Sequence, residues 1–174
     1  MSEAKQNYGR FAKIQHLLEL AINIMIGLML AGMVIVVFGN VIFRYFLNMA
    51  LAWSEEVSRF MLIWLAFMGA VIAYIRNEHL GLDILLRVLP PLGARIVAIV
   101  ADSLVVTALV IMTRGGIAMT ADSFASGWVA SSLPIPYGYV YMAAPIATGL
   151  MLLESVIKLL TDIRKLVMVV RGGV

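Results

Sequence analysis

Four long apolar stretches alternate with short polar segments along this chain. They cover residues 17–43, 57–75, 93–113 and 137–160. About 20 helical residues cross the roughly 30 Å hydrocarbon core of a bilayer, and isolated strands cannot satisfy their backbone groups in lipid. The pattern therefore predicts an all-α integral membrane protein with four transmembrane helices, folded as a single membrane domain over residues 1–174.

The segment between the second and third stretches has a different pattern. His79, Asp83 and Arg87 recur every four residues, on an otherwise apolar run that Pro90 and Pro91 end. A run of about eleven residues is too short to span a membrane, and its polar residues share one helix face. Residues 79–89 are therefore predicted to form a short amphipathic helix in the membrane interface.

The composition agrees with a lipid environment. The chain is 63% hydrophobic and 13% charged, with a mean hydropathy of +1.00, against roughly 45–50% apolar and about 25% charged residues in soluble domains. The net charge is small, at +3, and the basic residues lie mainly at the two ends and in one loop. This placement favours membrane lipid over nucleic acid as a partner. The chain has no cysteine, which excludes disulfides and thiolate metal sites.

The basic residues also predict an orientation, because cytoplasmic loops carry an excess of Lys and Arg. One side of the membrane would hold Lys5, Arg10, Lys13, Arg76, Arg87, Arg95, Lys158, Arg164, Lys165 and Arg171, and the other only Arg44, Arg59 and Arg114. Both termini are therefore predicted to be cytoplasmic. Six aromatic residues would flank the outer ends of the spans: Tyr45, Trp53, Trp128, Tyr137, Tyr139 and Tyr141.

A charged cluster lies at the start of the second span. Ser54 is a plausible N-cap, and Glu55 and Glu56 would then face the positive end of the helix dipole. Arg59 lies three and four residues after these acids, so an intrahelical ion pair is available. The cluster is either a well-capped helix entrance or a charged docking element for another subunit.

Polar residues inside spans are costly and therefore informative. Asn23, Asp102 and Glu154 fall in the inner half of three different helices, and Asp102 is the deepest acid. Asp102 could be a proton or cation site, or it could bond to Asn23 or a neighbouring subunit. Glu154 is expected to pair with Lys158, one turn further on.

Candidate chemistry is otherwise sparse. Both histidines lie at the inner boundary, and no zinc spacing, phosphate-binding glycine loop or nucleophile–base pattern occurs. No catalytic, substrate-binding or metal residue and no cofactor is predicted. Two rival functions stay open: an autonomous small transporter or channel using Asp102, and the membrane anchor of a redox complex.

Several short motifs follow one another in a recognisable order. They are NVIFRY at 40–45, WSEE at 53–56, WLAFMGA at 64–70, RNEHLGLD at 76–83 and LPIP at 133–136, followed by Pro145. In this order the chain resembles the small membrane subunit of tripartite ATP-independent periplasmic (TRAP) transporters, the DctQ-like family, of which the sialic-acid type is one candidate.

The resemblance implies a partner and a location. In that family a large multi-span subunit of the bacterial inner membrane transports an organic acid, either sialic acid or a C4-dicarboxylate, with a sodium gradient. A periplasmic binding protein delivers the substrate, and the small subunit pairs with the large one as a scaffold without substrate or sodium ligands. The positions that match the family, or are polar within spans, become subunit-interface or structural candidates: Arg44, Trp53, Glu55, Glu56, Arg59, His79, Asp83, Asp102 and Asn23.

Overall fold

The computed structural model describes residues 2–49, 51–76 and 91–170. The interfacial helix predicted at residues 79–89 lies outside the described residues. Its two candidate residues, His79 and Asp83, lie outside them as well.

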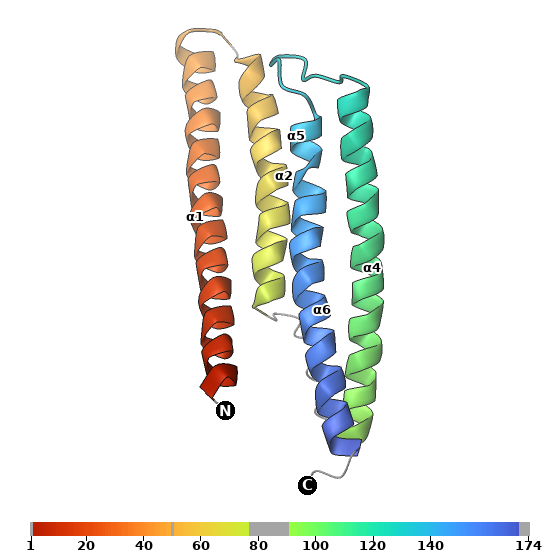
Figure 1. The fold of residues 1–174 in the computed structure, drawn as a ribbon. Coiled ribbons are helices and arrows are strands. Elements are labelled where there is room, and N and C mark those ends of the chain that lie inside the picture. Colours follow the sequence, from red (N-terminus) through yellow and green to blue (C-terminus); the bar gives the residue numbers. More distant parts are fainter. Residues whose placement is uncertain (1, 50, 77–90, 171–174) are drawn as a thin grey trace. The chain divides into compact units, whose positions relative to one another are not determined.

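Four long helices dominate the described residues (Figure 1). They are α1 (Ser2–Phe46), α2 (Ala52–Ile75), α4 (Pro91–Ala125) and α6 (Ala143–Val170), with the short α5 (Gly138–Tyr141) before α6. Each long helix contains a segment long and apolar enough to cross a membrane: Leu17–Phe46, Ala52–Ile75, Gly93–Ala125 and Gly138–Arg164, the last including α5. These helices confirm the predicted all-α class and the four spans.

Two helices extend beyond the apolar stretches predicted as spans. α2 begins at Ala52, before the stretch at residues 57–75, and α4 continues past Thr113 to Ala125. The third apolar stretch stops before Arg114, but an exposed arginine can extend its head group toward water, and α4 continues through Gly115 and Gly116. Two glycines cost only about 1 kcal/mol each in a helix. That cost is less than the cost of leaving backbone groups without hydrogen bonds in lipid.

The residues group into two compact units. The first holds α1, most of α2 and residues 130–134, and the second holds α4, α5 and α6. The single membrane domain stays a prediction of the sequence.

In the first unit, α1 ends at a tight turn. Asn48 has a φ of 51°, in the left-handed region that asparagine tolerates better than most residues. The Asn40 side-chain oxygen accepts the Leu51 N–H at 2.9 Å, so a side chain within α1 holds the residue that precedes α2. The turn thereby determines where the charged start of α2 lies.

In the second unit, α4 and α6 run side by side in opposite directions (Figure 1). Small residues allow the close approach: a Cβ added at Gly116 would lie 3.1 Å from Pro145 Cδ. The Thr113 hydroxyl donates to Thr148 Oγ1 at 3.0 Å, and Thr148 is buried. Small side chains and interhelical hydrogen bonds are the usual means by which membrane helices associate.

The connection between α4 and α5 is also ordered by local contacts. The Tyr137 N–H donates to the Trp128 carbonyl at 3.0 Å, and Val129 forms a bridge with Pro136. Gly138 lies directly against the Phe124 ring, where a Cβ would come within 2.7 Å. The chain therefore leaves α4 and returns into α6 along a defined path.

Candidate functional site

The carboxylate of Glu56 binds two consecutive backbone amides. Its Oε1 accepts the N–H of Ser131 and its Oε2 the N–H of Ser132, each at 2.9 Å. Glu56 is buried, with 9% of its surface exposed, so these bonds replace water that the carboxylate has lost. Hydrogen bonds to an ionised acceptor are roughly twice as strong as neutral ones. We call this contact the Glu56 clamp; it ties residues 130–134 to α2 within the first unit.

The first turn of α2 positions the Glu56 clamp. The Ser54 hydroxyl donates to the Leu51 carbonyl at 2.7 Å, and Ser54 is almost fully buried. The prediction that Ser54 is the N-cap is therefore wrong, because α2 begins at Ala52 and places Ser54 inside its first turn. Glu55 and Glu56 still lie near the positive end of the helix dipole, where acidic side chains stabilise a helix.

The other candidates near the outer helix ends are exposed on the surface of this chain. Glu55, Arg59 and Arg44 are exposed, and Trp53 is 39% exposed. In the described ranges Arg59 forms no ion pair with Glu55 or Glu56, because the Glu56 oxygens bind backbone amides instead. The structure thus separates one buried acid with defined partners from three exposed charges.

A second buried acid lies between α4 and α6. Asp102 Oδ1 is 3.4 Å from Lys158 Nζ, and the Asp102 side chain is 11% exposed while that of Lys158 is 46% exposed. Asp102 Oδ2 and the Ser155 hydroxyl are both buried and have no hydrogen-bond partner among the described residues. Lys158, which was predicted to pair with Glu154, also lies within ion-pair distance of Asp102, an acid on another helix. Asn23 is exposed on α1, in the other unit.

Sequence reasoning missed the partners of both acids. Ser131 and Ser132 lie in a loop far along the chain, and nothing in their spacing points to Glu56. Ser155 carried a weak signal, because it lies three residues before Lys158 and seven after the buried Thr148, on one side of α6. In the described part of the chain, no group of three His, Cys, Asp or Glu side chains could hold a metal ion.

Four long apolar helices define a multi-pass membrane protein. Its two buried acids bind other groups of the same chain. Comparison with known proteins identifies its class. Residues 33–165 match the family model described as tripartite ATP-independent periplasmic transporters, DctQ component.

Three relatives agree with that match. A TRAP transporter small permease protein of Haemophilus influenzae is 34% identical over 139 residues, covering 77% of this chain and 82% of the relative. The C4-dicarboxylate TRAP transporter small permease protein DctQ of Vibrio cholerae is 29% identical over 91 residues, covering 52% of this chain and 39% of the relative. The isethionate TRAP transporter permease protein DctMQ of Oleidesulfovibrio alaskensis is 25% identical, covering 66% of this chain and 17% of that longer protein.

The chain belongs to the DctQ family. It is a small membrane component of a TRAP transporter and a multi-pass protein of the bacterial inner membrane.

Proposed function

We propose that the chain is a non-catalytic scaffold that pairs with a large membrane subunit. That partner would import an organic acid with a sodium gradient, supplied by a periplasmic binding protein. The observation that carries the proposal is the small share of each span that its own chain covers. Only 6% of the first span and 11% of the third is buried within the chain. Lipid or another membrane protein must cover the remainder.

The relatives favour a protein partner for part of this surface. In the DctMQ protein of Oleidesulfovibrio alaskensis, the matching segment is one part of a much longer permease. A segment that is joined to a larger permease in one protein is a natural partner for a separate large subunit in another. The proposal assigns that arrangement to this chain.

The buried acids support a scaffold rather than an autonomous transporter. Glu56 binds two backbone amides, and Asp102 pairs with Lys158 on the neighbouring helix. Both acids therefore hold parts of the chain together, which is the interhelical role that we assign to Asp102. In this proposal the sodium and substrate ligands lie in the large subunit, and both termini face the cytoplasm.

The substrate class stays broad in this proposal. The relatives' names specify a C4-dicarboxylate in one case and isethionate in another. These two relatives therefore differ in the organic anion that their names specify, which supports specificity residing in the large subunit and the binding protein. Sialic acid and C4-dicarboxylates are both substrates that this scaffold could serve.

Co-purification tests the proposed pairing. A tagged chain, extracted in mild detergent from its own host, is expected to recover a larger multi-span membrane protein in a fixed ratio. Recovery of only self-oligomers would contradict the pairing.

Open glycines offer a way to locate the interface. Among the described residues, a built Cβ at Gly27 or Gly39 meets nothing within 4 Å outside the neighbouring backbone of α1, whereas a Cβ at Gly32 would meet Met61 at 3.4 Å. Gly27→Trp and Gly39→Trp are therefore expected to leave the isolated chain folded. Loss of the large subunit from either variant would place that face of α1 at the interface, and Gly32→Trp serves as the control that disturbs the chain itself.

A further inference from the structure

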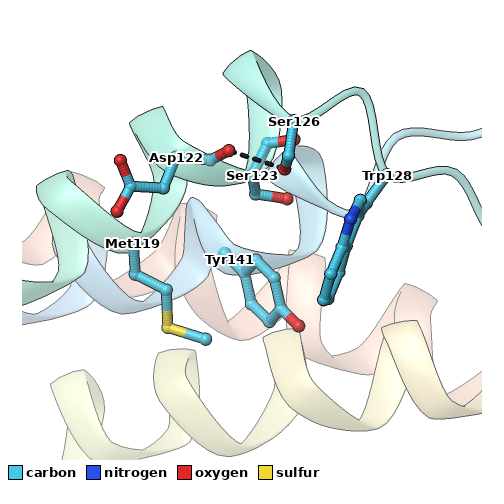
Figure 2. Close-up of a pocket in the computed structure, with 6 residues that line it drawn as sticks. All are labelled: Met119, Asp122, Ser123, Ser126, Trp128 and Tyr141. Carbon is cyan, nitrogen blue, oxygen red and sulfur yellow. Dashed lines mark hydrogen bonds between the residues drawn. The ribbon is translucent and has the colours of Figure 1, made fainter.

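A cavity of about 480 Å³ lies at the C-terminal end of α4. Figure 2 shows its lining, which comes entirely from the second unit: Met119, Asp122, Ser123, Ser126, Trp128 and Tyr141. Its lining shares no residue with the Glu56 clamp or with the Asp102–Lys158 pair. Its chemistry has no part in the proposed scaffold role.

The cavity holds polar groups that the chain does not use. Ser123 is 6% exposed, and its hydroxyl has no hydrogen-bond partner among the described residues. The Ser126 hydroxyl donates to the Asp122 carbonyl at 2.7 Å, so its oxygen remains able to accept a hydrogen bond. Asp122 is exposed, and within the described ranges its carboxylate forms no ion pair.

The charge of the lining selects the ligand. Asp122 contributes a negative charge, and the lining contains no Lys, Arg or His. Two aromatic side chains, Trp128 and Tyr141, border the same space as the Ser123 hydroxyl (Figure 2). A carboxylate together with aromatic rings is suited to a cation, because ring faces attract positive charge. The cavity therefore fits an ammonium group and disfavours a ligand with a net negative charge.

The depth of the cavity indicates where the ammonium comes from. The third span, Gly93–Ala125, is about 50 Å long at 1.5 Å per residue, which exceeds the roughly 30 Å hydrocarbon core. Excess length at its C-terminal end would place Asp122 and Ser123, in the last turn, at the level of the lipid headgroups. Ile117 and Met119, one or two turns below, are more than half exposed and offer apolar surface to an acyl chain.

We propose that this cavity binds the headgroup of a zwitterionic phospholipid carrying a primary ammonium, the ethanolamine class. The ammonium lies against the Asp122 carboxylate and the Ser126 oxygen. Its three N–H groups can donate hydrogen bonds to these oxygens, whereas a trimethylated amine has no N–H group to donate. The Ser123 hydroxyl donates to the headgroup phosphate. This site requires only that the chain lies in a membrane, so it does not depend on the scaffold role.

Native mass spectrometry of the full chain in detergent tests the site. The chain is mixed with equal amounts of phosphatidylethanolamine, phosphatidylcholine and phosphatidylglycerol that have identical acyl chains. We expect at least threefold more retained phosphatidylethanolamine than either other lipid. Asp122→Asn is expected to abolish that preference, and Trp128→Ala to weaken it. Glu55→Gln, which removes an exposed acid from the start of α2, is expected to keep it.

Three results would overturn the proposal. The first is equal retention of the three lipids or a preference for phosphatidylglycerol. The second is an Asp122→Asn variant that keeps the wild-type preference. The third result comes from cross-linking, which is possible because the chain has no native cysteine. If the cysteine of a Ser126→Cys variant cross-links to another membrane protein in the native complex, and the bound lipid is lost, then a protein occupies the cavity.

Discussion

Glu56 and Asp102 are both buried acids in a largely apolar chain, but their surroundings differ. Both oxygens of Glu56 accept backbone amides at 2.9 Å. Asp102 has one oxygen near a half-exposed lysine and one without a described partner. Glu56 lies in the first unit, whereas Asp102 lies between α4 and α6 in the second.

The comparison shows that the burial of an acid does not by itself measure how much the acid contributes to the free energy of unfolding. Removing Glu56 takes away the charged acceptor of the Ser131 and Ser132 backbone amides, so two charge-assisted hydrogen bonds are lost together. Removing the charge of Asp102 ends an ion pair whose attraction only partly offsets the cost of burying the charge. We therefore expect α2 to depend strongly on its acid and the α4–α6 pair to depend more on packing.

The largest effect is expected at the Glu56 clamp. Glu56→Ala removes two charge-assisted hydrogen bonds and should lower the free energy of unfolding by about 3 kcal/mol. Residues 126–136 should also become more sensitive to limited proteolysis. Reversible unfolding in mixed detergent micelles measures the first change, and Glu55→Ala, an exposed neighbour, is the control. Equal losses in the two variants would contradict the clamp.

A smaller effect is expected at the Asp102–Lys158 pair. Lys158→Met leaves the buried Asp102 without its cation and should destabilise the chain by about 2 kcal/mol, because the half-exposed lysine contributes less than a fully buried partner would. The double variant Asp102→Leu with Lys158→Met should return close to the wild-type stability. A double variant less stable than Lys158→Met alone would show that the acid has another essential contact.

Packing between α4 and α6 is tested by two adjacent glycines. Gly116→Ala places a methyl group 3.1 Å from Pro145, so we expect a loss of about 1 kcal/mol. A Cβ at Gly115 meets no described side chain within 4 Å, so Gly115→Ala should leave stability unchanged or slightly higher. The same unfolding assay compares the two, and equal effects would mean that the helices do not approach as described.

The smallest effect concerns the hydroxyl pair between these helices. Thr148→Val keeps the side-chain shape but removes one of two acceptors of Thr113, whose hydroxyl also lies 2.7 Å from the Leu109 carbonyl, so the cost should be only about 0.6 kcal/mol. Thr107→Val is the matched control, since Thr107 is exposed and donates to the Ser103 carbonyl of its own helix. If Thr148→Val lowered the free energy of unfolding as much as Lys158→Met, the hydroxyl pair would matter as much as the ion pair, which would contradict the proposed order of effects.

The helices were predictable because membrane spans depend on local composition, which the chain displays directly. Ser54 was predicted to be the N-cap of α2, but its hydroxyl donates to the Leu51 carbonyl instead of accepting a backbone amide. This contact depends on the position of Leu51, whose N–H binds Asn40 in the preceding helix. The partners of Glu56 and Asp102 were not predictable, since both contacts join distant segments and depend on tertiary packing. Family motifs marked Glu55 and Glu56 alike, and only the coordinates distinguish the buried acid from the exposed one.

The central claim is that this chain supports transport without supplying the transport site, and Asp102 gives the most direct test. Sodium-driven substrate uptake would be measured in proteoliposomes containing the assembled complex with Asp102→Asn, normalised to the amount of complex. Our account predicts uptake per complex within about twofold of wild type. Abolished uptake with undiminished assembly would contradict it and assign Asp102 a direct part in transport.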